Sequence, residues 1–286
     1  MSKEVSHEIL DALTRVKMPG PVRVLEPAET VEINGLECPL YRAGTLVLGS
    51  GAAGLRAAVE LKRRNIDVVV CSSGLFAGTS ACSGSDKQTI HTAGTANHGD
   101  DFVKLAADIG SGGAMDSDTA YVEAVGSIAA FAGLQYLGLP LPQDRFGAAL
   151  RYQTDHDEVG RATSCGPRTS RLMVKVLCEE AMRLKVPFIT RTTGVRILQQ
   201  DGGVKGLIAI SRDRSANPYG LAVILCERLV LATGGPGELY RDSVYPKNCF
   251  GSLGMAIEAG IEVSNLTESQ FGIGTWREEF PWNLSG

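Results

Sequence analysis

The chain has 286 residues, of which 44% are hydrophobic and 21% are charged. This length is about twice the ~150 residues typical of one domain, and the composition excludes an intrinsically disordered chain and a protein with many membrane spans. The 28 basic and 32 acidic residues give a net charge of −4, which argues against a general nucleic-acid-binding protein.

The N-terminal segment, residues 1–42, has a charged beginning followed by four prolines. It predicts a short polar helix and then an irregular arm, because proline disrupts regular elements. It has no continuous apolar run of the kind found in secretory signals, so we expect none. The organised part of the chain is expected to begin at residue 43.

A complete β-α-β unit is predicted next. Residues 45–48 form a short apolar run, and residues 49–54 read GSGAAG. Apolar residues then recur at helical spacing as far as Arg64, and residues 67–71 read DVVVC, as in a buried strand. This order is typical of a Rossmann-like, doubly wound parallel sheet.

Three helices are predicted in the middle of the chain, at residues 101–109, 118–137 and 169–184. The stretch 124–143 carries no charge over about the length of a membrane span. Because it is rich in Ala and Gly and is stopped by Gly and Pro, we interpret it as a buried helix.

A run of β-strand patterns follows, separated by turn residues. The predicted strands of an antiparallel, three-stranded meander are 193–199, 204–211 and 221–226, after a short strand at 188–190. Further elements are expected downstream: a buried strand at 229–232, a second glycine-rich turn, a helix at 254–260 and a strand at 261–263. The predicted fold class is therefore α/β, with a parallel sheet plus this meander.

The first glycine cluster has a spacing that phosphate binding requires. Gly49 suits the tight turn from strand to helix, Gly51 lets backbone N–H groups approach a pyrophosphate, and Gly54 lets the helix pack closely on the sheet. The acidic residue that often holds the ribose is missing, and the strand is followed by Ser72 and Ser73. Their hydroxyl groups either bind a ribose or belong to an ordinary serine-rich turn.

Five motifs in the same order resemble the succinate dehydrogenase/fumarate reductase flavoprotein family, which includes L-aspartate oxidase. They are GSGAAGLRAA at 49–58, a Ser/Gly-rich segment at 78–84, Arg168-Thr169, LVLATGG at 229–235, and Gln270-Phe271. The family resemblance implies bound FAD and a domain, residues 43–271, that binds it. The FAD-binding residues that we expect are Gly49, Ser50, Gly51, Ala52, Ala53, Gly54, Ser72, Ser73, Thr79, Ser80, Ser83, Gly84, Val195, Ala232, Thr233, Gly234 and Gly235.

Departures from the family pattern limit what the resemblance implies. Members with covalent FAD carry a histidine near position 81, where this chain has Ala81, so we expect non-covalent FAD. The family histidine that contacts succinate or fumarate is replaced by Gly272, which makes those two substrates doubtful. Residues 272–286 are expected to begin a capping domain whose remainder does not fit in this chain.

The resemblance implies hydride transfer between the flavin and a small carboxylate-bearing substrate, with catalytic residues unknown. The alternative is a non-catalytic FAD- or nucleotide-binding module, or one subunit of a split enzyme whose remainder is another chain. Arg161 and Arg168 either bind a substrate carboxylate or form ordinary ion pairs.

No metal site is expected, because the seven cysteines contain no C-x-x-C pair and no Cys/His cluster. Their odd number fits reduced thiols in a cytoplasmic protein. No nucleic-acid partner and no membrane span are expected.

Overall fold

The computed structural model describes residues 15–82, 88–94, 99–154, 157–237, 245–246 and 248–267. The chain divides into two compact units. The sheet unit comprises Lys17–Ser83 and Leu177–Glu262, and the helical unit comprises Met1–Val16, Gly84–Val176 and Val263–Gly286. The expected helix near the N-terminus falls within residues 1–14, outside the described residues.

The sheet unit contains β1 (Glu29–Ile33), β2 (Leu36–Leu48), α2 (Ala52–Arg63), β3 (Val68–Ser72), α3 (Thr79–Cys82), β6 (Phe188–Thr190), β7 (Thr192–Gln200), β8 (Gly203–Ser211), β9 (Leu221–Leu231) and α7 (Leu253–Glu258). The helical unit contains β4 (Ile90–His91), α4 (Phe102–Gly110), α5 (Ser117–Tyr136) and β5 (Ala162–Thr163). The division between the units falls within α6 (Thr169–Arg183).

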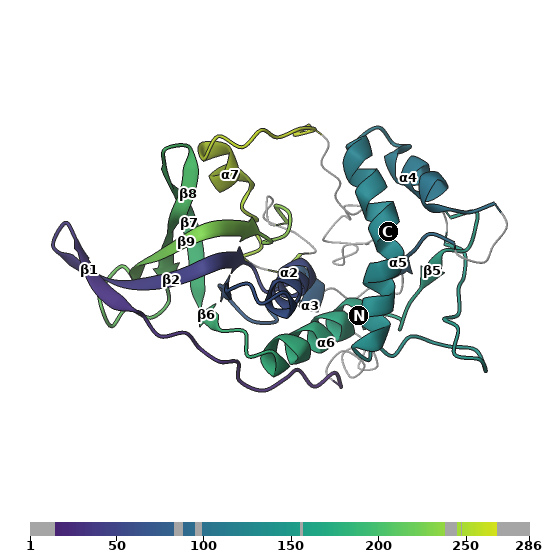
Figure 1. The fold of residues 1–286 in the computed structure, drawn as a ribbon, viewed down its shortest axis with the longest axis horizontal. Coiled ribbons are helices and arrows are strands. Elements are labelled where there is room, and N and C mark those ends of the chain that lie inside the picture. Colours follow the sequence, from purple (N-terminus) through teal and green to yellow (C-terminus); the bar gives the residue numbers. More distant parts are fainter. Residues whose placement is uncertain are drawn as a thin grey trace, which may run out of the picture. The chain divides into compact units, whose positions relative to one another are not determined.

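One seven-stranded sheet forms the centre of the sheet unit (Figure 1). Its order is β6-β3-β2-β9-β8-β7, with β1 paired to β2. The first four strands are parallel, and the pairs β9-β8, β8-β7 and β1-β2 are antiparallel. A parallel sheet extended by an antiparallel meander, the predicted fold class, is confirmed.

The centre of the parallel part of the sheet is buried because the segments of its strands that pair there are mostly apolar. All five residues of β3, which read VVVCS, are buried, as expected for a strand covered on both faces. Leu46 of β2 pairs with Val69 of β3 on one side and with Leu229 of β9 on the other. These strands therefore hold their carboxyl ends in a fixed register, which places the functional site described below.

Some local predictions in the sheet unit are wrong. The arm was expected to be irregular through residue 42, but residues 29–33 and 36–42 lie in β1 and β2. The strands expected at 221–226 and 229–232 are one continuous strand, β9, because β2 pairs with it along nearly its whole length. No strand forms at residues 261–263, which read IEV, since so short a segment needs a sheet edge to pair with.

The two helices α4 and α5 pack against each other in the helical unit. Each begins at an aspartate whose carboxylate accepts a hydrogen bond from a backbone N–H of the first turn: Asp101 from Lys104 and Asp116 from Thr119, both at 2.8 Å. These contacts are helix N-caps. The predicted helices at 101–109 and 118–137 are thereby confirmed to within one residue at each end.

The uncharged stretch 124–143 was expected to be a buried helix, and only its burial is wrong. The helix α5 ends at Tyr136, just before Gly138 as expected, but only Ala120, Ala124, Phe131 and Leu134 are buried in it. Val122 is 70% exposed. The lack of charged residues in this stretch therefore does not indicate that the whole helix is buried. Within the described residues, no helix is long and apolar enough to cross a membrane.

A buried cluster of charges also holds the helical unit together. The guanidinium of Arg161 donates to the Asp100 carboxylate from Nε and Nη2 at 3.0 and 2.6 Å, and from Nη1 to the Asp108 carboxylate at 2.6 Å. Asp157 accepts the backbone N–H of Arg161. These contacts join the loop before α4, helix α4 and the loop before β5.

Candidate functional site

The glycine turn between β2 and α2 is shaped by close backbone contacts. Gly49 has φ of +117°, a value that side chains disfavour, and an added Cβ there would lie 2.2 Å from the carbonyl oxygen of Ala232. A Cβ on Gly54 would lie 2.0 Å from the carbonyl oxygen of Gly49. The first and third glycines are therefore required for the chain to pack, whatever binds there.

Gly51 differs from the other two because an added Cβ there would not meet the backbone. The atoms nearest to it would belong to the Ser80 side chain, Oγ at 3.2 Å and Cβ at 3.9 Å. Gly51 is also the N-cap residue of α2 and has no side chain to cap the helix. The N–H of Ala52 instead donates to Ser80 Oγ at 3.3 Å. The positive end of the α2 dipole thus opens onto the space beside Gly51, as at anion-binding helix N-termini.

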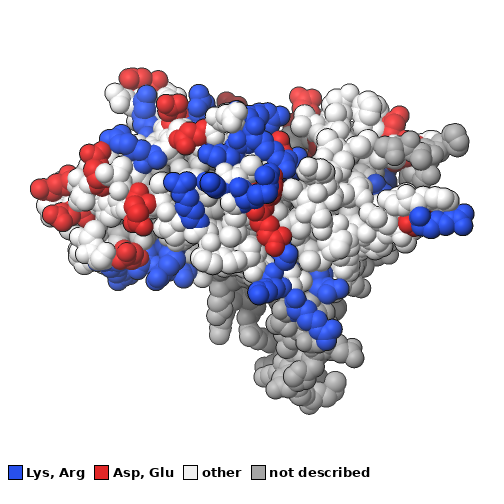
Figure 2. Space-filling model, turned by 60° about the horizontal axis from the view of Figure 1, so that its bottom comes forward, with Lys and Arg blue, Asp and Glu red and all other residues white. Residues whose placement is uncertain are grey.

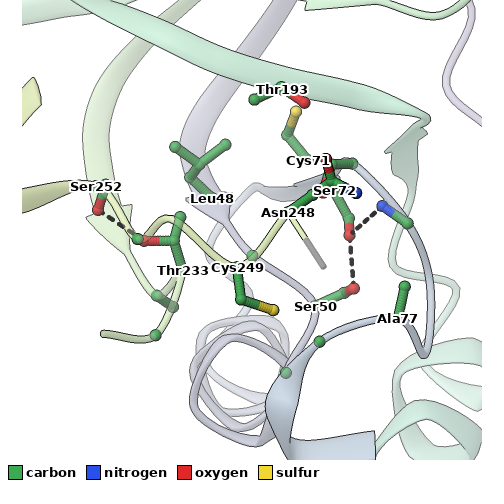
Figure 3. Close-up of a pocket in the computed structure, with 18 of the residues that line it drawn as sticks. Leu48, Ser50, Cys71, Ser72, Ala77, Thr193, Thr233, Asn248, Cys249 and Ser252 are labelled. Atoms are coloured by element: carbon green, nitrogen blue, oxygen red, sulfur yellow. Dashed lines mark hydrogen bonds between the residues drawn. The ribbon is translucent and has the colours of Figure 1, made fainter. Parts of the chain in front are cut away.

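Serine hydroxyl groups connect the glycine turn to the end of β3. The hydroxyls of Ser50 and Ser72 are hydrogen-bonded at 2.7 Å, and Ser72 Oγ also accepts from the N–H of Gly74 at 3.3 Å (Figure 3). The preceding residue, Cys71, has its pKa raised to about 12 by burial, so its thiol stays protonated at neutral pH. This wall of the site is therefore polar but uncharged.

The second glycine-rich segment forms the opposite wall. Thr233 follows β9 and donates from Oγ1 to Ser252 Oγ at 2.8 Å (Figure 3). Ser252 is the N-cap residue of α7. The contact joins the end of β9 to residues 248–252, which also line the site. The carboxyl ends of three neighbouring parallel strands, β3, β2 and β9, thus meet at one place, where ligands bind in open α/β sheets.

Together these segments enclose a cavity of about 270 Å³, all of it within the sheet unit. This lies just below the roughly 300–1,000 Å³ of pockets for drug-sized ligands. A ligand as long as a dinucleotide therefore extends beyond the described walls. The lining residues are 48–53, 71–74, 77–80, 192–194, 212, 232–234 and 248–252.

The structure brings most of the predicted FAD-binding residues to this cavity. Those that line it are Gly49, Ser50, Gly51, Ala52, Ala53, Ser72, Ser73, Thr79, Ser80, Ala232, Thr233 and Gly234.

The remaining predicted residues do not line the cavity or lie outside the described residues. Gly54 packs behind the turn, and Gly235 follows the segment that forms the wall. Val195 is 41% exposed on β7, and the preceding residue, Gly194, lines the cavity instead. Ser83 and Gly84 lie outside the described residues.

Several cavity-lining residues are not among those expected from the sequence: Leu48, Cys71, Gly74, Ala77, Gly78, Arg212, residues 192–194 and residues 248–252. Two of these groups carry a weak signal, since residues 192–194 come just after the carboxyl end of β6 and residues 248–252 come just before α7, and ligands bind near such positions. Arg212 carries none, because it lies in a charged loop that reads as solvent-exposed.

The two arginines considered as substrate ligands lie in segments that do not line the cavity. Arg161 is 5% exposed and is bound by the carboxylates of Asp100 and Asp108. Ion pairing, one of the two interpretations, is therefore confirmed for Arg161. The role of Arg168 stays a prediction.

Comparison with known proteins agrees with the geometry of the cavity. Residues 44–280 match the family described as FAD binding domain. The chain is 32% identical over 241 residues to an L-aspartate oxidase of Xylella fastidiosa, covering 79% of this chain and 43% of that protein. It is 26% identical over 246 residues to a succinate dehydrogenase flavoprotein subunit of Rickettsia bellii, covering 81% of this chain and 40% of that protein.

A solved structure of quinol fumarate reductase from E. coli has the same fold over 77% of this chain and 37% of that chain, with a TM-score of 0.66 at 21% identity. The chain thus spans about two fifths of the length of the relatives that it matches.

Proposed function

The chain belongs to the family of FAD-binding domains, and from this premise we propose that it is the N-terminal, cofactor-binding portion of an FAD-dependent oxidoreductase. The observation that carries the proposal is the N-terminus of α2 at Gly51, which faces a cavity at the carboxyl ends of β2, β3 and β9. The relatives in the comparison are oxidoreductases by name.

The residues of the cavity fit FAD. The pyrophosphate of FAD carries two negative charges, and the α2 N-terminus offers backbone N–H groups at Gly51, the one glycine of the turn where an added Cβ would not meet the backbone. No Asp or Glu lies among the described residues that line the cavity, so nothing there repels the phosphates. The fit therefore rests on space and charge together.

We assign the two halves of the cofactor from the direction of the sheet. The turn at residues 49–54 holds the pyrophosphate, and the hydroxyls of Ser72 and Ser73 hold the adenosine ribose without charge. The isoalloxazine lies toward Thr79 and Ser80, on α3. When bound, FAD supplies the group that accepts or donates a hydride, and the chain holds the cofactor in position against a polar wall.

Non-covalent attachment of FAD follows from the residue at position 81. Ala81 is 3% exposed and carries only a methyl group, so it cannot form a bond to the flavin. Cys82 is exposed and donates from Sγ to the carbonyl oxygen of Phe76 at 3.4 Å. Neither residue supports a covalent link.

Substrate and partners belong to the complete protein. The chain spans about two fifths of its relatives, and the described cavity contains one charged side chain, Arg212. We propose that the substrate is a small carboxylate and that its ligands come from a segment beyond this chain or from a second chain. A cytoplasmic location is supported by seven cysteines that are all free.

The alternative function is a non-catalytic FAD- or nucleotide-binding module. The observation that favours it is the burial of Arg161 in an ion cluster, which leaves this arginine unable to bind a substrate. The two functions differ in whether photoreduced FAD on the complete protein is reoxidised by an unsaturated dicarboxylate in a saturable manner. Saturable reoxidation supports the oxidoreductase, and its absence supports the module.

FAD binding is tested by titrating the purified chain with FAD and following the visible absorbance of the flavin. We expect the wild type to bind FAD and Gly51→Val to bind none, because the added side chain fills the space of the phosphates. The matched control is Gly112→Val, at a glycine with open space in the helical unit. Acid precipitation of the loaded protein is expected to release all flavin into the supernatant.

Two results would contradict these expectations. FAD binding by Gly51→Val at wild-type affinity would show that the turn is only structural. Flavin that stays on the precipitated polypeptide would refute non-covalent attachment.

A further inference from the structure

Arg212 is the one charged side chain among the described residues that line the cavity. It follows β8 directly, and its side chain is exposed. Within the described part of the chain, its guanidinium has no hydrogen bond or ion pair. The neighbouring carboxylate of Asp213 is engaged elsewhere, since it accepts from the N–H of Ser215 at 3.0 Å. The arginine is therefore available to a ligand.

Backbone contacts place Arg212 on the adenosine side of the cavity. Its N–H donates to the carbonyl oxygen of Arg191 at 2.9 Å, and the preceding residue pairs with Thr192 on β7. The carbonyl oxygen of Thr192 in turn accepts from Cys71 Sγ at 3.6 Å. Cys71 directly precedes the two serines at the end of β3, which is where dinucleotide sites hold the ribose.

The chemistry of arginine suits the part of FAD that lies beyond this ribose. A guanidinium is planar and weakly hydrated, and it stacks on aromatic faces. Adenine presents such a face. Because adenine is uncharged, an arginine binds it by stacking and not by an ion pair. The other described groups on this side, residues 192–194, offer backbone and hydroxyl groups but no flat surface.

We propose that Arg212 determines the preference of this pocket for FAD over FMN, because its guanidinium packs against the adenine ring of the cofactor. The inference rests on the proposed binding of FAD at this cavity. It assigns adenine recognition to a residue outside the glycine motifs.

The test compares three ligands that share parts of FAD. Wild type, Arg212→Ala and Arg212→Lys are titrated with FAD and FMN by flavin fluorescence, and with ADP by competition against FAD. We expect Arg212→Ala to lower the affinity for FAD and for ADP by about tenfold and to leave the affinity for FMN unchanged. Arg212→Lys keeps the positive charge but replaces the planar guanidinium, so the affinity for FAD and ADP should fall by nearly as much.

Arg214→Ala is the matched control, because it removes the same charge from the same exposed loop at a residue that does not line the cavity. Its affinity for all three ligands and the melting temperature of every apo variant should equal the wild-type values. Equal weakening of FMN and FAD, or full recovery by Arg212→Lys, would overturn the inference. Failure of the wild type to bind FAD would instead overturn the proposed function, and the inference with it.

Discussion

The cavity of the sheet unit and the Arg161 cluster of the helical unit use polar side chains in opposite ways. In the sheet unit the core is apolar, and hydroxyl groups at the strand ends line a cavity with few partners besides each other. In the helical unit, buried polar groups bind one another, as Arg161 does with Asp100 and Asp157. The difference shows where a ligand can bind, since groups already paired inside the protein have little to offer it.

Exposed charge pairs complete the comparison. The guanidinium of Arg42 lies 2.6 Å from the Glu29 carboxylate, with both side chains at least half exposed. Figure 2 shows acidic and basic side chains lying side by side over much of the face that it draws. Pairs of this kind contribute little to stability, whereas a buried charge that loses its partner is costly.

The largest expected effect is therefore in the helical unit. Arg161→Ala leaves the Asp100 carboxylate, whose side chain is fully buried, without its partner, which costs about 3–5 kcal/mol. Hydrogen exchange followed by mass spectrometry should show faster exchange in α4 and β4. Exchange in β2 and β3, and the affinity for FAD, should stay at wild-type values, because the described cavity lies in the sheet unit.

Arg42→Ala is the matched control, since it breaks an exposed ion pair. Its free energy of unfolding is expected to fall by less than about 1 kcal/mol. Equal losses for both variants would contradict the contrast between buried and exposed pairs. A large loss of FAD affinity in Arg161→Ala would show that the two units are not independent.

A smaller effect is expected from Gly54→Ala in the sheet unit. The new methyl group would lie 2.0 Å from the carbonyl oxygen of Gly49, so helix α2 must shift, at a cost of about 1–3 kcal/mol. The matched variant is Gly126→Ala in α5, where nothing lies within 4 Å. Gly126→Ala should raise the free energy of unfolding by about 0.5–1 kcal/mol, because alanine favours the helix more than glycine does. Urea unfolding followed by circular dichroism measures both, and the same sign for both would contradict the prediction.

The smallest effect is a dependence of stability on pH in the acid range. Hydrogen bonds from Arg161, opposed by burial and aided by the N–H of Gly94, lower the pKa of Asp100 from its ordinary value of 3.8. The pKa of Asp100 is thus lower in the folded state than in the unfolded state. The ionised carboxylate therefore contributes its full stabilisation of the fold above the ordinary pKa, and this stabilisation is lost as pH falls through the folded-state pKa.

The prediction is measured by urea unfolding of the wild type and of Asp100→Asn across the acid range. The wild type should be more stable than Asp100→Asn at neutral pH. The difference between their free energies of unfolding should narrow once pH falls below about 3.8. A gap that stays constant with pH would show that the Asp100 carboxylate contributes no charge-dependent stability.

Much of the fold could be predicted from the sequence alone. Strands β3, β7 and β8 have short runs of β-branched or alternating residues between turn residues, and helices α4 and α5 begin at aspartate caps. Such patterns are local, so the chain shows them without tertiary contacts. The glycine turn could be predicted for the same reason, because Gly54 packs on Gly49 within one strand-turn-helix unit. The close approach of Gly49 to Ala232 is a tertiary contact, which the turn sequence does not show.

Only the tertiary structure decided which residues meet around the cavity. Arg212 and residues 192–194 are more than 100 positions from the glycine turn, and they reach the cavity because β7 and β8 join the same sheet as β2. The choice between Val195 and Gly194 depends on which side of β7 faces Leu48. The exposure of α5 and the burial of Arg161 were likewise decided by packing, since burial depends on neighbours that are distant in sequence.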